Sequence, residues 1–248
     1  MRPSTRLVVL GKKLWTPAQI STDLWLDAAD SSTITLNGST VSQWNDKSGN
    51  GRNATQATAA NQPAYNETQN GLRVVTFDGT NDTLNTVAFT FPTTNLASCC
   101  VFRTTSITAK GVWGGGETFP NRLGLFFTGS SQLRSMQNDS GIDIGGYSTN
   151  VYVLVSSSRI GADVSQFRDG TQVANATMIA ENAASFALSI GSWANNVVPS
   201  LAGQFAELVI FNSNTTTRQL IEGYLAWKWG LVANLLLSHP FKFNPPLA

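Results

Sequence analysis

Val164-Ser165-Gln166-Phe167-Arg168-Asp169-Gly170-Thr171-Gln172-Val173-Ala174 is the stretch that indicates the fold most clearly. Two short runs with β-branched and aromatic residues flank the dipeptide Asp169-Gly170. Both residues of an Asp-Gly pair tolerate positive φ, which the favoured two-residue hairpin turns require. The stretch therefore predicts a β-hairpin.

Further short runs with β-branched or aromatic residues, bounded by turn residues, extend this pattern along the chain. They are residues 24–26, 33–36, 41–44, 72–77, 87–91, 99–102, 123–127, 133–136, 151–155, 186–190 and 205–211. The turn signal Asn37-Gly38 separates two of them. Many short strands with frequent turns are typical of a sandwich rather than a parallel α/β sheet. The sequence predicts an all-β, two-sheet antiparallel jelly-roll sandwich.

One helix is predicted near the C-terminus, over residues 217–230. Leu220, Tyr224, Trp227 and Leu231 recur at helical spacing. Thr216 is the expected N-cap, with Gln219 closing a capping box, and Gly230 is the expected end. Gly223 inside the helix predicts a close approach to another backbone, because glycine otherwise costs about 1 kcal/mol there.

The domain division follows from these elements. Residues 1–22 are interpreted as an N-terminal arm, and residues 23–248 as one sandwich that includes the helix and an extended C-terminal tail. The apolar run at residues 7–10 is too short for a signal-peptide core. No run reaches the ~20 apolar residues of a membrane span. We therefore expect a protein made in a cytoplasm, without a membrane span.

Composition narrows the range of partners. Of the 248 residues 12% are charged, and the formal net charge is +1, with no long run of Lys and Arg. Nucleic acid is therefore not expected as a partner. The two cysteines, Cys99 and Cys100, are adjacent, so an ordinary disulfide between them would need a strained turn. Both are expected to act as small apolar side chains.

A series of motifs resembles the laminin-G-like, concanavalin A-like jelly-roll domains. The motifs are residues 24–30, 44–51, 77–82, 167–170 and 205–211, in that order. The segment 222–231, with His239-Pro240 beyond it, is similar to a subgroup found in bacteriophage virion proteins and some bacterial surface proteins. The resemblance extends over about residues 14–246. It implies a lectin-like sandwich, a fold that hosts many functions.

Two oxygen-rich turns are candidates for a calcium site. Asp46 lies in the first, and Asp78, Asn81 and Asp82 form the second. Calcium is bound by six to eight oxygen ligands with converging carboxylates, and some laminin-G-like relatives bind it at one rim. The alternative for both turns is that their side chains bond their own backbone. The sequence favours the turn interpretation and leaves Ca²⁺ open as the one candidate cofactor.

The sequence predicts no enzyme. Related polysaccharide hydrolases place carboxylates at alternating positions on one strand, so that they face one cleft, and no such run is present. Glu207 is alone in its strand, Glu222 is on the helix, and His239 is the only histidine. A glycosidase would require two carboxylates within ~5–9 Å in one cleft.

Two functional hypotheses remain. The first is a bacteriophage virion structural protein, a capsid decoration or a tail component. It would lie on the virion surface, contact other virion proteins through its arm, pair with like subunits, and touch host surface glycans. The second is a stand-alone carbohydrate-binding module. Candidate sugar contacts for that hypothesis are Trp113, Trp193, Asn195 and Asn196.

Overall fold

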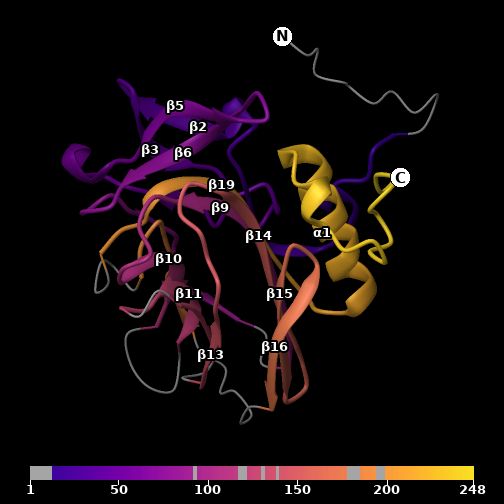
Figure 1. Ribbon diagram of the computed structural model, residues 1–248. Helices are drawn as coiled ribbons and strands as arrows, with labels where there is room; N and C mark the ends of the chain where they lie inside the picture. The colour runs from indigo at the N-terminus through magenta and orange to yellow at the C-terminus, as the bar shows by residue number, and fades with distance from the viewer. Residues whose placement is uncertain are drawn as a thin grey trace.

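The computed structural model is almost entirely β-structure, with one helix among the described residues, α1 (Thr215–Trp229). It describes residues 13–91, 94–116, 122–129, 132–137, 140–177, 185–193 and 199–248. Hydrogen bonds join seventeen strands into one antiparallel network that folds into two layers. α1 lies against the outer face of one layer (Figure 1). The predicted all-β sandwich with a C-terminal helix is confirmed.

The first layer contains the longest strands, and β19 (Ala202–Phe211) lies at its centre. One edge of β19 pairs with β9, and the other pairs with β6 along one half and with β1 along the other. Outward from β19 the strands are β9 (Asn95–Thr104), β14 (Tyr152–Ile160), β15 (Asp163–Arg168) and β16 (Thr171–Thr177) on one side, and β1 (Thr22–Asp27), β6 (Leu72–Asp78) and β5 (Ala64–Gln69) on the other.

The second layer is built of shorter strands. In spatial order they are β13 (Ser140–Ile144), β12 (Leu133–Gln137), β11 (Leu123–Phe127), β10 (Lys110–Gly115), β18 (Ser189–Ile190), β7 (Leu84–Asn85), β4 (Ala54–Thr55), β3 (Thr40–Trp44) and β2 (Ile34–Asn37). A single pairing, Thr40 with Ala64, links this layer to the first. β8 (Phe89–Thr90) and β17 (Ser185–Phe186) form a separate ribbon. Four short 3₁₀ helices, η1 (Pro17–Gln19), η2 (Ser31–Thr33), η3 (Ala59–Asn61) and η4 (Val232–Asn234), complete the described elements.

The hairpin predicted at Asp169-Gly170 is confirmed. Arg168 pairs with Thr171 across the turn. Asp169 has φ 50° and Gly170 has φ 76°. Positive φ at both central residues is the geometry that matches the twist of the flanking strands. The Asp-Gly signal therefore fixed the turn and the pairing of β15 with β16.

The central strands of the first layer, β9, β14 and β19, are buried on both faces along most of their length, which explains their continuous apolar runs. Along β9, Leu96, Cys100 and Phe102 pack between the two layers. Ala97, Cys99 and Val101 alternate with them and pack against α1. The two cysteines thus point to opposite faces, and both are free and buried. Their predicted role as small apolar side chains is confirmed.

The start of α1 differs from the prediction, whereas its end agrees with it. The N-cap is Asn214, whose side chain accepts a hydrogen bond from Thr217 N at 2.8 Å. The predicted cap at Thr216 is wrong, because an N-cap needs extended φ and ψ and Thr216 is already helical. Gly230, with φ 75°, ends the helix as expected. A Cβ on Gly223 would lie 2.6 Å from the Cβ of Phe241, so the close neighbour is a tail side chain.

The described part of the N-terminal arm is held against the C-terminal tail. Leu14 bridges to Leu247, and Trp15 N donates to the carbonyl oxygen of Pro246 at 3.0 Å. Trp15 is buried beside α1. Residues 1–12 lie outside the described residues. No helix in the described parts of the chain is long and apolar enough to cross a membrane.

Candidate functional site

The loop after β3, which begins at Asp46, covers the free edge of β1. β1 pairs only with β19, so its other edge leaves backbone groups open. Asp46 Oδ1 accepts from Trp25 N at 3.0 Å, and Lys47 N donates to the carbonyl of Trp25 at 2.8 Å. Asn50 Nδ2 donates to two further β1 carbonyls at 3.0 and 3.1 Å. The loop therefore satisfies an edge that would otherwise be open to another strand.

The Asp46 carboxylate is fully engaged in this loop. Besides Trp25 N, it accepts from Ser48 N at 2.9 Å, Ser48 Oγ at 2.6 Å and Arg52 N at 3.1 Å. Both carboxylate oxygens thus have protein donors. These contacts match the turn interpretation of Asp46.

The Asp78 turn is organised in the same way. Asp78 Oδ1 accepts from the backbone N–H groups of Thr80, Asn81 and Asp82 at 2.8 to 3.3 Å. Burial alone would raise the pKa of Asp78, but these hydrogen bonds outweigh it and lower the pKa. Asp82 Oδ2 accepts from Asp78 N at 2.9 Å. Burial, together with the Asp78 charge, raises the pKa of Asp82 to about 6.

The candidate calcium ligands do not form one cluster. Asp46 lies after β3, whereas Asp78, Asn81 and Asp82 follow β6. Asn81 Nδ2 donates to Asn61 Oδ1 at 2.9 Å. Within the described ranges, no group of three or more His, Cys, Asp or Glu side chains is placed to hold a metal ion. Calcium binding by either turn stays a prediction.

The candidate sugar contacts Trp113 and Trp193 are buried, so their expected exposure is wrong. Trp113 is 2% exposed and packs between the layers. Trp193 is 5% exposed, and its ring lies edge-on to Phe126 at 4.9 Å. Cβ atoms on Gly114 and Gly124 would lie 2.6 and 2.8 Å from that ring, so the strands hold glycine where the indole packs. Asn195 and Asn196 lie outside the described residues.

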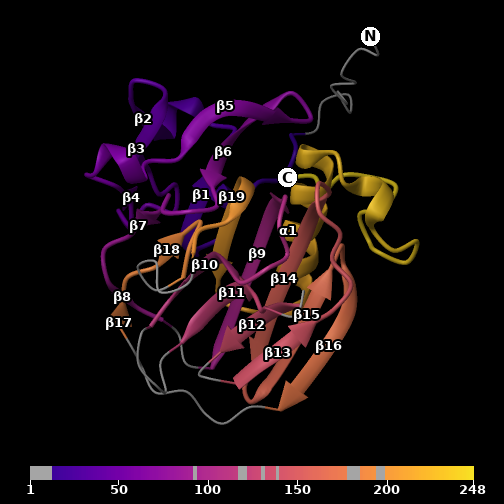
Figure 2. The ribbon, with the colours of Figure 1, turned by 60° about the vertical axis from the view of Figure 1, so that its left-hand side comes forward.

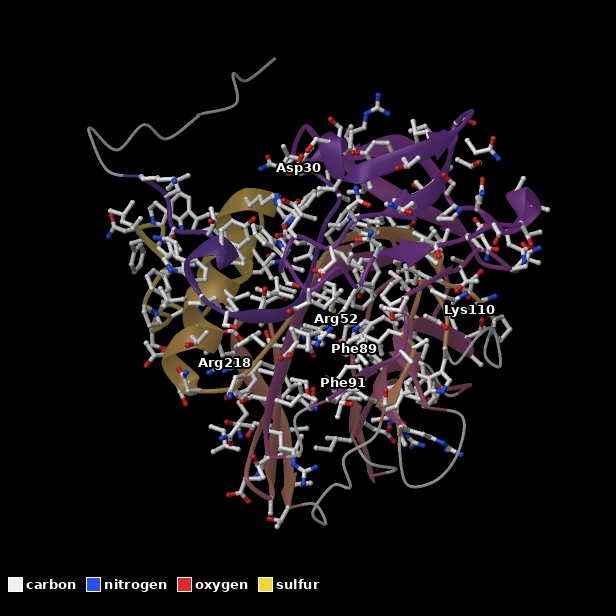
Figure 3. All side chains as sticks on the ribbon, turned by 180° about the vertical axis from the view of Figure 1, so that it is seen from behind. Asp30, Arg52, Phe89, Phe91, Lys110 and Arg218 are labelled. Carbon is white, nitrogen blue, oxygen red and sulfur yellow. The ribbon has the colours of Figure 1, made fainter. Side chains whose placement is uncertain are left out.

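An aromatic stack packs against the core between the layers, and Figure 3 labels three of its members, Arg52, Phe89 and Phe91. The Arg52 guanidinium lies 4.0 Å from the ring centre of Phe89. The ring centres of Phe89 and Phe91 are 4.2 Å apart. Phe91 stacks on Phe186, with 4.7 Å between their ring centres. Phe89 and Phe91 are buried. Arg52 also donates to the carbonyl of Asp23 at 2.7 Å, so this group is held by packing rather than presenting a free surface.

A chain of alternating charges attaches α1 to the first layer. Lys228 Nζ donates to Asp27 Oδ1 at 2.5 Å and to Glu207 Oε2 at 2.7 Å. Lys47 Nζ donates to Asp27 Oδ2 at 3.0 Å and to Asp30 Oδ2 at 2.7 Å; Asp30 marks the outer end of the chain in Figure 3. The five groups join β1, β19, α1 and the edge-covering loop.

Glu207 is the buried centre of this chain of charges. Its Oε1 accepts from Trp25 Nε1 at 2.8 Å and Tyr224 Oη at 2.9 Å. Its Oε2 accepts from Trp229 Nε1 at 2.8 Å besides Lys228. Burial raises the pKa of Glu207, and the Lys228 charge opposes that rise. Every acceptor position of the carboxylate is therefore occupied.

Asp27 and Glu207 lie close together, because the Lys228 ammonium contacts both at 2.5 and 2.7 Å. Glycosidase chemistry also requires an open cleft in which the two carboxylates flank a sugar bond. Here Lys228 occupies the space between them, and both carboxylates are buried beneath α1. This pair therefore holds the helix in place and offers no substrate access.

His239 is buried, with Glu222 and Arg218 of α1 beside it. Arg218 Nη1 contacts both Glu222 oxygens at 2.5 and 2.6 Å. His239 Nε2 lies 3.3 Å from Glu222 Oε2, and its Nδ1 accepts from Phe241 N at 3.2 Å. An accepting Nδ1 leaves the proton on Nε2, which donates to Glu222. The histidine therefore links the tail to the helix.

A group of polar side chains that are partly or largely buried lies across the outer face of the first layer, and we call it the polar row. Its members are directly opposed on four neighbouring strands: Tyr152 on β14, Arg103 on β9, Gln204 on β19 and Thr76 on β6. Figure 2 shows these strands side by side. Three strand spacings of about 4.8 Å make the row roughly 14 Å long.

The polar row occupies the outer face of the first layer beyond its apolar, helix-covered part. Val101, Ala206, Val74 and Leu154 belong to the core beneath α1. Each member of the polar row lies two residues along its strand from one of these, and side chains two apart share a face. Three of the row's members are half-buried, and Gln204 is 7% exposed.

Hydrogen bonds hold the polar row in one arrangement. Arg103 Nη1 donates to Gln204 Oε1 at 2.6 Å, and Arg103 Nη2 donates to Asn150 Oδ1 at 2.8 Å. Tyr152 Oη lies 3.4 Å from the same Gln204 oxygen. Burial raises the pKa of Tyr152 to about 12, with Arg103 lowering it and Glu67 raising it. The phenol therefore remains a proton donor at neutral pH.

The chemistry of the polar row suits a hydroxylated ligand. It places an aromatic ring, a guanidinium and an amide side by side, whereas the Thr76 hydroxyl oxygen is buried without a hydrogen-bond partner. Small-ligand sites combine such apolar faces with a few fixed polar groups. Sequence reasoning missed these residues, because they are separated by up to 128 positions and only strand register brings them together. A pattern within any one strand gives no signal of the row.

No family model matches the chain, and no curated protein sequence matches it. Solved structures do resemble it. Trypanosoma rangeli sialidase in complex with 2,3-difluorosialic acid matches with a TM-score of 0.61 and 15% identity, over 92% of this chain and 36% of the sialidase. Domain 4 of AbnA, a GH43 extracellular arabinanase from Geobacillus stearothermophilus in complex with arabinotriose, matches with a TM-score of 0.57 and 12% identity, over 78% of this chain and 93% of that domain.

The binding domain of Paraclostridial Mosquitocidal Protein 1 also matches, with a TM-score of 0.54 and 10% identity, over 81% of this chain and 52% of that chain. This chain thus spans about a third of the sialidase and about half of the binding domain. At identities this low the similarity concerns the fold. The chain has a β-sandwich fold that resembles parts of these three structures.

Proposed function

We propose that this chain is a non-catalytic, lectin-like domain that binds glycans through the polar row. The single observation that carries the proposal is the cross-strand alignment of Tyr152, Arg103, Gln204 and Thr76 on an uncovered part of the first layer. A sugar ring can stack on the phenol while its hydroxyls exchange hydrogen bonds with the amide and guanidinium. The AbnA domain, which was solved with arabinotriose, supports a carbohydrate ligand for this fold.

The arrangement of the described carboxylates supports binding without hydrolysis. Asp27 and Glu207 share Lys228 and are buried. The carboxylates of Asp46 and Asp78 accept hydrogen bonds from their own turns. We therefore expect no cleavage of any glycan that the protein binds.

A glycan array with purified protein tests the proposal. We expect binding to at least one glycan class, weakened about tenfold by Gln204→Ala, which corresponds to about 1.4 kcal/mol. Tyr152→Ala should weaken it similarly, whereas Tyr152→Phe should retain the stacking part. Gln172→Ala on the exposed edge strand β16 is the matched control. An array with no bound glycan, or equal binding by all variants, would contradict the proposal.

We further propose that the domain is displayed on a bacteriophage particle as a capsid decoration or tail component. The segment 222–231 supports this setting through its resemblance to virion proteins. The first described N-terminal residues pair with the last residues of the chain, so both ends of the sandwich lie together at Leu14 and Leu247. We propose that the particle is attached at these ends and that the polar row contacts host glycans. Mass spectrometry and imaging of purified particles test this setting, and its absence from particles would refute it.

A further inference from the structure

Arg103 carries a positive charge, and the side chains that its terminal nitrogens contact are neutral. Its two terminal nitrogens donate to the amide oxygens of Gln204 and Asn150, which are neutral. Among the described residues, no ion pair within 4.0 Å includes Arg103. By contrast, Arg52, Arg134 and Arg218 each pair with an aspartate or glutamate. The charge in the polar row is thus available to a ligand.

The donors around Arg103 converge on the same surface. Each terminal nitrogen of a guanidinium carries two protons, and the intramolecular bonds use one of each. Gln204 Oε1 accepts hydrogen bonds from Arg103 and Tyr152. The amide Nε2 of Gln204 therefore points away from these two side chains and is a further donor. Guanidinium groups bind carboxylate and related anions through paired N–H donors, and such bonds are about twice as strong as neutral ones.

Glu67 sets the electrostatic balance of the row. It is exposed on β5, and its charge acts on the Tyr152 phenol. It makes no ion pair with Arg103. A negative ligand bound at Arg103 would be repelled by Glu67, whereas a neutral ligand would not. We therefore expect Arg103 to strengthen, and Glu67 to weaken, the binding of an anionic ligand.

We infer that the polar row selects sugars that carry an anionic group, a carboxylate or a sulfate, and that Arg103 is the residue that determines this specificity. The inference rests on the proposed glycan-binding function and names its ligand class. The anionic group binds the guanidinium and the Gln204 amide. The sugar ring lies against Tyr152.

Calorimetry on the full chain tests the inference with three probes: a uronic-acid oligosaccharide, its carboxyl-reduced neutral counterpart, and a sulfated oligosaccharide of similar length. We expect at least one anionic probe to bind tenfold or more tightly than the neutral one. The stronger of the two anionic probes identifies the group as carboxylate or sulfate. Affinity for it should fall between 50 and 500 mM salt, because salt screens exposed charges.

Variants separate the roles of the two charges. Arg103→Gln should abolish the preference for the anionic probe, and Arg103→Lys should keep only part of it, because lysine lacks the paired donors. Glu67→Gln should strengthen anionic binding and leave neutral binding unchanged. Arg134→Gln removes an equal charge from the second layer and is the matched control. Circular dichroism confirms that each variant is folded.

The outcomes distinguish the inference from the proposed function. Equal affinity for the neutral and anionic probes would overturn the inference and leave glycan binding intact, as would a preference that survives Arg103→Gln in a folded variant. Failure of the wild-type protein to bind any sugar, on the array and by calorimetry, would overturn the proposed function itself.

Discussion

Replacing Lys228 by methionine should strongly destabilise the sandwich. The ammonium lies between Glu207, whose side chain is fully buried, and Asp27, whose side chain is 5% exposed. Methionine preserves most of the packing volume but leaves the buried Glu207 carboxylate without a counter-charge and Asp27 with Lys47 alone. Removing one partner of a buried ion pair costs about 3–5 kcal/mol. For a domain of this size each kcal/mol lowers Tm by roughly 2–4 °C, so we expect a loss of roughly 10 °C.

The comparison variant is Lys47→Met. Lys47 is 22% exposed, and its partner Asp27 keeps Lys228 after the substitution. Its other partner, Asp30, is 35% exposed, so solvent screens this pair and we expect a loss of about 1 kcal/mol or less. Urea denaturation at pH 7, followed by tryptophan fluorescence, measures both losses by linear extrapolation.

The pH dependence of the stability lost in Lys228→Met provides the sharpest check. Burial already holds the pKa of Glu207 above its ordinary value, with Lys228 opposing that shift. Without the ammonium the carboxyl binds a proton more readily, and protonation removes the unpaired charge. The difference in unfolding free energy between variant and wild type should therefore shrink as pH falls from 7 to 5. A loss below 1 kcal/mol at pH 7, or one that does not shrink at pH 5, would refute this reasoning.

Four further outcomes are expected. Asp82 has a pKa of about 6, above its ordinary value, so the folded state binds this proton more tightly than the unfolded state. The free energy of unfolding of the wild type should therefore fall as pH rises from about 4 to 6. Asp82→Asn should flatten that slope in urea titrations. Trp193→Ala should cost about 3–5 kcal/mol by emptying the space beside Gly114 and Gly124, and an unchanged Tm would contradict its buried position. Gly223→Ala should displace Phe241 and make the tail sensitive to protease despite the better helix propensity of alanine. Calcium added to chelator-treated protein should change Tm by less than about 1 °C, because a ligand that does not bind the folded state cannot stabilise it; a larger rise would favour a calcium site.

The strands and hairpins could be predicted because their signals are local. The Asp169-Gly170 turn fixes its own geometry, and β9 and β19 have runs long and apolar enough to identify buried strands. The helix could be placed from its spacing, but its first turn could not. Asn214 and Thr216 are both competent caps, and only the direction of the incoming chain decides between them.

The site residues were harder to predict, because exposure depends on packing partners that the sequence does not reveal. Trp193 lies among polar residues along the chain, which suggests an exposed aromatic. In the fold, glycines on two other strands make room for its ring. Asp46 and Asp78 have the composition of ligand-binding turns, yet their oxygens bond the backbone around them. Composition alone does not separate these two uses of a carboxylate.

The polar row differs from an ordinary exposed strand end in how firmly its side chains are held. Exposed strand ends commonly carry side chains that move independently in water. Here Arg103 is fixed by two amides, and Tyr152 and Arg103 meet at one oxygen of Gln204. A ligand that binds such a surface loses less free energy to ordering of side chains than one that binds flexible residues. A guanidinium that is held in place by neutral amides has no evident benefit for folding. Selective binding of an anion requires such a fixed charge.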